Sequence, residues 1–433
     1  MRIAIAWYGA EGQSSYRYFH ERGDDVTIVT PQVSSQFPLP EGAKAIVGEH
    51  AFDHLSDFDV VVRSAALRPD RIVTNGKIWS ATNEFFARCP VPIIGVTGTK
   101  GKGTTSSFVA SILREAGKAV QLVGNIGVPP LDVLSLLQPD DIVVFELSSF
   151  QLWDLQKSPH TAVVLMIEPD HLDVHKDMAE YIAAKSGIVK HQTAQDTVIS
   201  HPLNRYSEEI ARQSPGRRMH FADSGEHEVY IRDGAFYRDE QRICGTDAVQ
   251  LTGDFNLENA CAAIAASLEY IDDFAAIERG LRRFTGLPHR LKLVREVNGV
   301  GWYDDSIATT PGSAIAALQS FAGKNIVILL GGSDKGADYT PIVQEAQRVG
   351  AIVVAIGHTG ETIAKLCQSH HVRVIREAGM MPEVVRAAAE IAQPDGVVIL
   401  SPASASLDQY KSYSDRGDQF VAAVEGIATH GTN

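Results

Sequence analysis

A glycine-rich turn is the first feature of this sequence that is suited to chemistry. It follows the apolar run 93–96 and reads Thr97-Gly98-Thr99-Lys100-Gly101-Lys102-Gly103-Thr104. Glycines let successive backbone N–H groups face a phosphate, a lysine neutralises the phosphate charge, and the N-terminus of a following helix adds positive potential. We therefore expect this turn to bind the phosphates of a nucleotide, with Lys102 as the phosphate lysine.

The turn departs from the usual phosphate-binding pattern at two positions. Val96 stands six residues before Lys102, where the pattern has glycine. Gly103 follows that lysine, where Ser or Thr would offer a hydroxyl to Mg²⁺. Thr104, one position further on, is expected to provide the hydroxyl instead. Taken alone, the turn fits a strand-to-helix connection without a ligand equally well.

A second, weaker glycine turn spans residues 7–12 near the start of the chain. The dinucleotide fingerprint needs a glycine where Trp7 stands, and it needs an acidic residue after the second strand, where the chain has Thr30-Pro31-Gln32. NAD binding is therefore disfavoured, whereas a substrate that carries a diphosphate remains compatible with this turn.

The elements that would position these turns fall into three blocks. In the first block, about 1–80, strands are predicted at 2–7, 26–29 and 59–62 and a helix at 14–22. In the second, about 81–286, strands are predicted at 93–96, 142–146 and 162–167, helices at 104–116 and 258–270, and a β insertion at about 213–250. In the third, about 287–433, strands are predicted at 326–330, 352–356, 372–375 and 397–400. This alternation predicts an α/β protein with parallel sheets.

Composition and charge narrow the class of protein. The 433 residues include 39 Lys and Arg against 53 Asp and Glu, a formal net charge of −14, which disfavours nonspecific binding to nucleic acid or to an anionic membrane. No signal-peptide pattern and no apolar stretch long enough for membrane insertion is present. The four cysteines form no CxxC pair, as expected for reduced thiols in a cytoplasmic protein.

Nine short strings follow the glycine turn in a fixed order. They are GNIG (124–127), ELSSFQL (146–152), EPDHLDVH (168–175), AAK (183–185), TGDFNLENA (252–260), LPHRLK (287–292), DDSIATTP (304–311), GGSDKGADY (331–339) and SPASASLDQYKSYSDRGDQF (401–420). With the turn they resemble the MurD family of glutamate ligases, over residues 95–420. ELSSFQL and the last string are specific to this branch, whereas the turn and the HR pair belong to the wider Mur and folylpolyglutamate ligase superfamily.

The resemblance implies a three-domain architecture and an activity. It implies a Rossmann-like domain at 1–80 that binds the UDP substrate, a central P-loop ATPase-type α/β domain at 81–286, and a C-terminal Rossmann-like domain at 287–433 that binds glutamate. The implied reaction joins D-glutamate to UDP-N-acetylmuramoyl-L-alanine through an acyl phosphate, for peptidoglycan synthesis. A cytoplasmic monomer that uses ATP and two Mg²⁺ ions is expected.

Residue roles carry over from the family string by string. Catalysis is assigned to Lys102, Glu146, His171 and Lys185, and metal binding to Thr104, Glu146, His171 and Lys185. Contacts with ATP are assigned to Gly98, Thr99, Lys100, Gly101, Lys102, Gly103, Thr104, Asn256, Asn259, Arg290 and Asp305. Lys185 matches a lysine that the family carbamylates, which converts a cation into an anion able to hold Mg²⁺. Plainer explanations are a structural acid, a structural histidine, a solvated lysine, helix capping by the two asparagines, and a surface ion pair between Arg290 and Asp305.

The two other substrates also receive residues from the resemblance. Asn125, Ser148 and Gln151 align with residues near the nucleotide sugar. Thr309, Lys335, Ser406, Leu407 and Tyr413 align with the glutamate pocket, where a lysine, hydroxyls and backbone donors suit a ligand with two carboxylates. The residues that contact uracil in the first domain are not recognisable from the strings.

Several positions depart from the family pattern. Lys100 stands where Asn is usual, Gly103 where Ser is usual, and Phe255 where His often precedes Asn256. Ile307 replaces a lysine, so one phosphate or substrate contact is absent. We expect Lys100 to restore a cation near the same phosphates.

Three alternatives to the main interpretation remain at this point. The first is the same ligation with L-glutamate, because Ile307 and Thr310 depart from the usual string. The second is folylpolyglutamate synthesis, against which ELSSFQL and the C-terminal string argue. The third is a nucleotide-binding scaffold without catalysis, which the altered glycine turn suggests and the retained Glu146, His171 and Lys185 disfavour.

Overall fold

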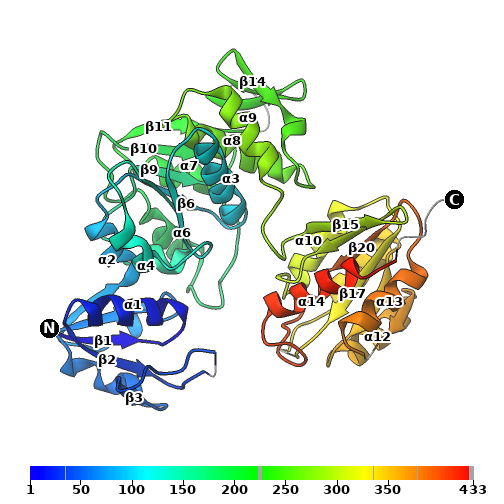
Figure 1. Ribbon diagram of the computed structural model, residues 1–433, viewed down its shortest axis with the longest axis horizontal. Helices are drawn as coiled ribbons and strands as arrows, with labels where there is room; N and C mark the ends of the chain where they lie inside the picture. The colour runs from blue at the N-terminus through cyan, green and yellow to red at the C-terminus, as the bar shows by residue number, and fades with distance from the viewer. Residues whose placement is uncertain (35, 223–226, 335, 378, 429–433) are drawn as a thin grey trace. The chain divides into compact units, whose positions relative to one another are not determined.

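The computed structural model describes residues 1–34, 36–222, 227–334, 336–377 and 379–428. The chain forms two compact units, one made of Met1–Gln250 and Asp254–Phe284 and the other of Leu251–Gly253 and Thr285–Asn433. The first unit contains two large parallel sheets and a small antiparallel sheet, and the second contains one mixed sheet (Figure 1). The predicted α/β class with three sheet-based parts is confirmed.

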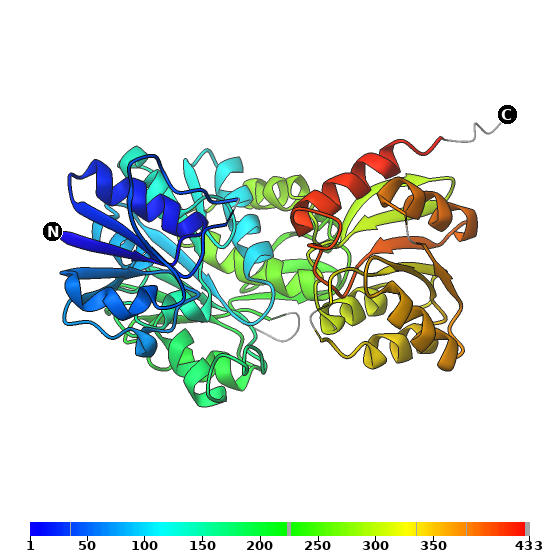
Figure 2. The same ribbon diagram turned by 90° about the horizontal axis from the view of Figure 1, so that it is seen from below.

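The first sheet has five parallel strands in the order β3-β2-β1-β4-β5. Its elements are β1 (Arg2–Ala6), α1 (Ala10–Glu21), β2 (Asp25–Thr30), β3 (Lys44–Val47), η1 (Ala51–Asp57), β4 (Val60–Arg63), η2 (Pro69–Arg71) and β5 (Lys77–Ser80). Alternate residues of β1 face opposite sides, so Ile3 and Ile5 pack with α1 while Ala4 and Ala6 pack with η1. Helical segments lie on both sides of this sheet (Figure 2). Both faces of the sheet are therefore covered, as parallel sheets require.

The second sheet has six parallel strands in the order β11-β10-β9-β6-β8-β7. The strands are β6 (Ile93–Thr97), β7 (Val120–Gly124), β8 (Ile142–Glu146), β9 (Thr161–Val164), β10 (Thr197–Ser200) and β11 (Arg217–His220). The helices are α2 (Ala81–Arg88), α3 (Lys102–Glu115), α4 (Pro130–Val133), η3 (Leu134–Leu136), α5 (Ser149–Leu152), α6 (Met178–Ser186), α7 (Arg205–Ala211), α8 (Phe255–Ser267) and α9 (Phe274–Arg283). The predicted β insertion is an antiparallel sheet of β12 (Val229–Arg232), β13 (Ala235–Arg238) and β14 (Gln241–Gly245), followed by η4 (Thr246–Ala248).

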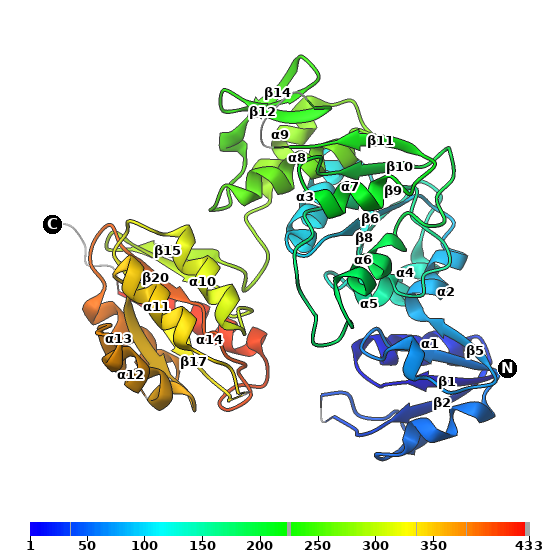
Figure 3. The same cartoon turned by 180° about the vertical axis from the view of Figure 1, so that it is seen from behind.

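The sheet of the second unit runs β15-β16-β20-β17-β18-β19, and β15 alone is antiparallel to its neighbour. Its strands are β15 (Lys292–Val297), β16 (Val300–Asp304), β17 (Ile326–Gly331), β18 (Ile352–Ile356), β19 (Val374–Arg376) and β20 (Val397–Leu400). Helices α10 (Pro311–Ser320), α11 (Thr340–Val349) and α12 (Gly360–Ser369) pack on one face, and α13 (Met381–Ile391) and α14 (Tyr413–Glu425) pack on the other (Figures 1 and 3). The apolar runs 326–330, 352–356 and 397–400, which predicted β17, β18 and β20, are buried except for the half-buried Ile352, whereas the run 372–375 around β19 is mostly half-buried or exposed.

The boundaries at 80 and 286 stay predictions. The compact units separate at 284/285, and the residues on either side of position 80 pack within one unit. Within the described ranges, no helix is long and apolar enough to cross a membrane.

The buried side chain of Arg63 links the first sheet to the segment around α5, which packs on the second sheet. Arg63 ends β4, and its side chain is fully buried. Its Nε and Nη2 atoms donate to the carboxylate of Asp154 at 2.8 and 2.5 Å, and Nη2 also donates to the carbonyl of Phe150 at 2.9 Å. Its Nη1 donates to the carbonyls of Ser64 and Leu67. The guanidinium is thus satisfied by groups from both sheets.

Replacing this guanidinium tests how much the contact stabilises the first unit. Arg63→Met keeps the length of the side chain but leaves Asp154 and the carbonyl groups without their donor. We expect a loss of about 3–5 kcal/mol in the free energy of unfolding. The measurement is denaturant unfolding of the two chains side by side.

Arg2→Met is the matched control, because Arg2 pairs with Asp59 on the surface, where both side chains are about half exposed. We expect it to cost no more than about 1 kcal/mol. Equal losses in the two variants would show that Arg63 does not have this role.

Candidate active site

The glycine turn connects the end of β6 to the start of α3. Gly98 and Gly101 have φ angles of 156° and 81°, which side chains other than glycine rarely allow. A Cβ atom on Gly101 would lie 2.2 Å from Oδ1 of Asn259, and one on Gly98 would lie 2.6 Å from Cβ of Leu165. These two glycines are therefore required by the backbone conformation and by close packing, before any ligand is considered.

Two lysine ammonium groups meet at this turn. Lys102, the first residue of α3, donates to the carbonyls of Gly98 at 3.2 Å and Thr99 at 2.8 Å. Lys185, on α6, donates to the same Gly98 carbonyl at 2.7 Å and lies over the ring of Tyr181. Lys102 and Lys185 are 83 positions apart in the sequence, and the fold brings their side-chain nitrogens to one oxygen atom.

The environment of Lys185 favours the neutral amine. The side chain is only 1% exposed. Burial lowers the pKa of this amine well below its ordinary value, and the nearby charge of Lys102 lowers it further, while Asp170 and Glu146 act in the opposite direction. An uncharged amine is a nucleophile, so this lysine is suited to covalent modification.

Glu146 and His171 lie at the same edge of the second sheet. Glu146 is the last residue of β8, pairs in register with Val96 of β6, and is buried. His171 has a φ of 54° and a half-exposed side chain, with its Nε2 atom 3.6 Å from a carboxylate oxygen of Asp170 and its ring against Phe150. The carboxylate is therefore fixed beside the turn, whereas the imidazole remains accessible.

The side chains near the turn include oxygen and nitrogen atoms that could act as ligands of Mg²⁺. Within the described part of the chain, no group of three or more His, Cys, Asp and Glu side chains is arranged to hold a metal ion. Glu146, His171 and Asp170 supply oxygen and nitrogen donors, and Thr104, buried in the first turn of α3, supplies a hydroxyl. Such a set suits a cation that is also held by phosphate oxygens.

The turn is tied to the loop that carries His171. The hydroxyl of Thr99 donates to the carbonyl of Glu168 at 3.0 Å, accepts the N–H of Glu168 at 2.9 Å and lies 3.1 Å from the hydroxyl of Tyr181. Lys100 is 79% exposed, and its Nζ atom lies 3.8 Å from the carboxylate of Glu168. A lysine this exposed is free to move toward a ligand.

Asn256 and Asn259 join α8 to the turn. The side-chain N–H of Asn259 donates to Oδ1 of Asn256 at 3.2 Å, and the hydroxyl of Thr105 donates to Oδ1 of Asn259 at 3.3 Å. Asp254, and neither asparagine, occupies the N-cap position of α8. Helix capping is therefore not the explanation for these two residues.

The residues assigned to the nucleotide sugar follow β7 and β8. Ser148 and Gln151 form a reciprocal capping box on α5, in which Ser148 Oγ accepts the Gln151 N–H at 3.2 Å and Gln151 Oε1 accepts the Ser148 N–H at 3.0 Å. Asn125 is exposed after β7, and its N–H donates to the carbonyl of Glu146 at 3.4 Å. The sequence did not reveal the capping role, although Ser148-x-x-Gln151 matches the capping-box pattern.

In the second unit, Asp305 is buried at the end of β16. Its carboxylate accepts the Ser401 hydroxyl at 2.7 Å and the Leu291 N–H at 3.1 Å. Burial raises the pKa of Asp305 to about 7, although both hydrogen bonds lower it. Arg290 is exposed. Because the carboxylate of Asp305 is buried, the plainer explanation of Arg290 and Asp305 as a surface ion pair does not apply.

The described members of the glutamate group differ in exposure. Ser406 is buried, Thr309 is half-buried, and Leu407 and Tyr413 are 68% and 40% exposed. Lys335 lies outside the described residues.

Sequence reasoning missed two buried groups in the second unit. Arg416 donates to the hydroxyl and carbonyl of Ser306 and to the carbonyl of Ser404, at 2.8–3.1 Å. His289 Nδ1 lies 2.7 Å from the carboxylate of Asp304. Both residues belong to the motif strings, Arg416 in the pair Arg416-Gly417 and His289 in the pair His289-Arg290, but the strings did not indicate these contacts. Both groups hold together the loops that contain the assigned residues.

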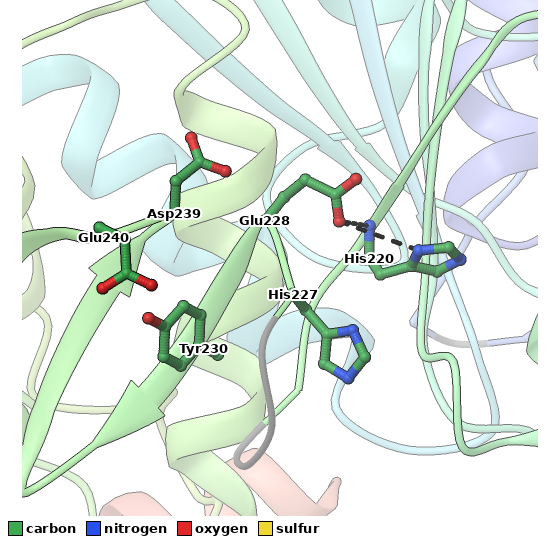
Figure 4. A pocket seen from close by; sticks show the side chains of 6 residues that line it. All are labelled: His220, His227, Glu228, Tyr230, Asp239 and Glu240. Carbon is green, nitrogen blue, oxygen red and sulfur yellow. Dashed lines mark hydrogen bonds and ion pairs between the residues drawn. The ribbon is translucent and has the colours of Figure 1, made fainter.

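A separate pocket of about 480 Å³ lies at the β insertion (Figure 4). It is lined by His220, His227, Glu228, Tyr230, Asp239 and Glu240. The backbone N–H of His220 donates to Glu228 at 2.9 Å across its wall. The pocket contains none of the residues that the sequence assigned to the site.

Known proteins are similar in sequence to this chain along almost its whole length. The profile of the Mur ligase middle domain matches residues 96–267, and that of the Mur ligase glutamate ligase domain matches residues 289–404. A UDP-N-acetylmuramoylalanine–D-glutamate ligase from Acetivibrio thermocellus is 34% identical, over 98% of this chain and 96% of that relative. This chain belongs to the Mur ligase family. The identity places it with the D-glutamate ligases of that family.

Solved Mur ligases also share the fold. The UDP-N-acetylmuramate–alanine ligase MurC from Thermotoga maritima aligns with a TM-score of 0.63 at 18% identity, over 98% of this chain and 99% of that one. MurF ligase from Thermotoga maritima, in complex with ADP, aligns with a TM-score of 0.58 at 17% identity, over 98% and 95%. Both likenesses extend along almost the whole of this Mur ligase.

The raised pKa of Asp305 predicts how stability depends on pH. The folded protein keeps a proton on this carboxyl up to about pH 7, whereas the unfolded chain releases it near pH 4. The folded state is therefore destabilised as pH rises from about 4 to 7, by at most about 4 kcal/mol, since one pKa unit corresponds to about 1.4 kcal/mol. Asp305→Asn removes this titration.

Thermal unfolding at several pH values measures the effect. We expect the Asp305→Asn variant to be more stable than the natural chain at pH 8, with an advantage that shrinks toward pH 4.5. A difference in melting temperature that stays constant over this range would contradict the assignment. Asp59→Asn, at an exposed carboxylate paired with Arg2, is the control.

Proposed function

We propose that this Mur ligase uses ATP to join D-glutamate to UDP-N-acetylmuramoyl-L-alanine, a step in peptidoglycan precursor synthesis. One observation carries the proposal: the side-chain nitrogens of Lys102 and Lys185 share the Gly98 carbonyl beside Glu146, in a chain that matches a D-glutamate ligase over 98% of its length. Cations gathered on a glycine turn at a helix N-terminus suit a polyphosphate. The scaffold alternative would bind the same polyphosphate, but it would not need Glu146, His171 and Lys185 beside the turn.

The reaction has two steps. A carboxylate oxygen of the L-alanyl substrate attacks the γ-phosphorus of ATP, the bond to the β-phosphate oxygen breaks, and ADP leaves. The amine of glutamate then attacks the acyl carbon, inorganic phosphate leaves, and the amine loses a proton as the amide forms. Phosphorylation is needed because a free carboxylate has no adequate leaving group at neutral pH.

The residues of the first unit position and stabilise the charged groups. Lys102 would leave the turn carbonyls and pair with the transferring phosphate, and the turn amides would hold its oxygens. Asn256 and Asn259, at the start of α8, would contact the adenine side. Thr104, Glu146 and His171, with a carbamylated Lys185, would hold two Mg²⁺ ions, which neutralise phosphate charge when bound.

The other substrates are assigned to the remaining parts. The first sheet would bind the UDP group, and Asn125, Ser148 and Gln151 the sugar side. In the second unit, Arg290 and Asp305 would contact phosphate and ribose, and the group of Thr309, Lys335, Ser406, Leu407 and Tyr413 would bind glutamate. We further propose that the enzyme works in the cytoplasm as a monomer.

Carbamylation of Lys185 gives a testable consequence. The neutral amine adds to CO₂, a C–N bond forms and one proton is released, which leaves an anion where a cation stood. Lys185→Ala is expected to lower kcat by about 100-fold or more, since a lost charge-stabilising group typically costs that much. Short carboxylates such as acetate should restore part of the rate.

Removal of CO₂ and bicarbonate should slow the natural enzyme reversibly. Lys190→Ala, at an exposed lysine just beyond α6, is the control and should keep full activity. Full activity of Lys185→Ala, or indifference to both CO₂ and acetate, would contradict the carbamate.

A phosphate-release assay tests the function itself. We expect release of phosphate and ADP only when ATP, Mg²⁺, UDP-N-acetylmuramoyl-L-alanine and D-glutamate are all present, with a new amide product detected by mass spectrometry. L-glutamate in place of D-glutamate, and a folate in place of the nucleotide sugar, separate the two enzymatic alternatives. The proposal fails if D-glutamate gives no product, and binding of ATP without any turnover would favour the scaffold.

A further inference from the structure

The backbone at Trp7 is in a conformation that its side chain disfavours. Trp7 has a φ of 79°, a region where a bulky residue is rare and costly. The residue is held on both sides: its N–H donates to the carbonyl of Val29 at 2.8 Å, and its carbonyl packs so closely on Gly12 that a Cβ there would lie 2.5 Å away. A glycine would adopt this conformation without strain.

The side chain of this strained residue is also exposed. The indole of Trp7 is 40% accessible to solvent, although tryptophan usually buries most of its surface. Its ring stacks beside that of Phe52 on η1, with centroids 6.4 Å apart and planes inclined by 22°. The two aromatic rings are therefore neighbours and nearly parallel, and we call this pair the Trp7–Phe52 platform.

The platform lies where open parallel sheets bind ligands. Trp7 directly follows β1, and the strand order β3-β2-β1-β4-β5 reverses direction between β1 and β4. Ligands of such sheets bind outside the carboxyl ends of the strands at this switch point. A residue that gave only packing to the core would point into the sheet layers, where Ala6 and Tyr8 are buried.

We propose that the Trp7–Phe52 platform binds the uracil base of the nucleotide-sugar substrate by stacking. Stacking on an aromatic side chain needs an accessible flat face, and the strain at Trp7 is retained because it presents that face. This inference rests on the proposed function, which supplies a pyrimidine nucleotide as the ligand, and it assigns residues of the first domain to that nucleotide. The three other tryptophans, Trp79, Trp153 and Trp302, are less exposed.

Binding of UDP alone tests the platform without any need for turnover. Titration of the full chain with UDP should quench tryptophan fluorescence and give a dissociation constant by calorimetry. Trp7→Ala should raise this constant by about tenfold, in the range that one stacked base contributes, whereas Trp7→Phe should retain most of the affinity. Trp79→Phe is the matched control and should keep both the quenching and the affinity.

Trp7→Gly separates a binding role from a structural one. Because glycine adopts the same φ without strain, we expect this variant to melt at a higher temperature than the natural chain and yet bind UDP about tenfold more weakly. In the ligase assay, the KM for UDP-N-acetylmuramoyl-L-alanine should rise by the same factor, while kcat and the KM values for ATP and glutamate stay unchanged.

The outcomes distinguish this inference from the function on which it rests. If the natural chain binds UDP but shows no ligation, the proposed function fails while the titrations still test the platform. If Trp7→Ala and Trp7→Gly bind UDP as well as the natural chain does, or if the natural chain does not bind UDP, the platform is overturned.

Discussion

The carbonyl oxygen of Gly98 accepts hydrogen bonds from the side-chain nitrogens of Lys102 and Lys185, and the candidate active site depends on this contact. Like charges repel, so two lysines converge on one atom only where the surroundings compensate for them. The protein does so in two ways: burial makes Lys185 prefer its neutral form, and Glu146 lies at the end of the neighbouring strand. A polyphosphate would compensate more fully, which is why the geometry favours a nucleotide at this turn.

The rest of the site is arranged around this contact by hydrogen bonds between helices and loops. Tyr181 bridges the two sides, because its hydroxyl meets Thr99 and its ring lies under the amine of Lys185. Asn259 fixes the turn from α8 and fills the space that a side chain at Gly101 would need. Hydrogen bonds and close packing from α6 and α8 therefore hold the glycine turn in place, although Lys100 and Gly103 depart from the family pattern.

Much of the fold followed from the sequence because buried parallel strands are written as continuous apolar runs. Residues 326–330, 352–356 and 397–400 are such runs, and each lies within or forms a strand. The short strands β3 and β5 and the β15–β16 hairpin were not predicted, since their residues are mixed and partly exposed. The strand predicted to reach Trp7 ends at Ala6, because the chain turns into a left-handed conformation there.

Only those residues of the candidate site that belong to the motif strings could be predicted from the sequence. The motif strings assigned Lys102, Glu146 and Lys185 to one site, and their roles stay predictions, although the fold brings Lys102 and Lys185 to the same carbonyl. The capping box of Ser148 and Gln151 is a local pattern that could have been recognised in the sequence. The network of Arg416 joins loops 110 residues apart, so the RG pair could mark the residue but not its partners. Backbone strain at Trp7 is likewise invisible in a sequence.

The placement of Arg63 has a consequence for biosynthesis. Its carboxylate partner, Asp154, follows it by 91 residues, so the first sheet leaves the ribosome before the group that neutralises its buried guanidinium has been made. During that interval the nascent segment holds an uncompensated charge at the end of a central strand. The contact between Arg63 and Asp154 can therefore form only after β8 and α5 have been synthesised, and a fragment that ends at residue 80 would lack this partner altogether.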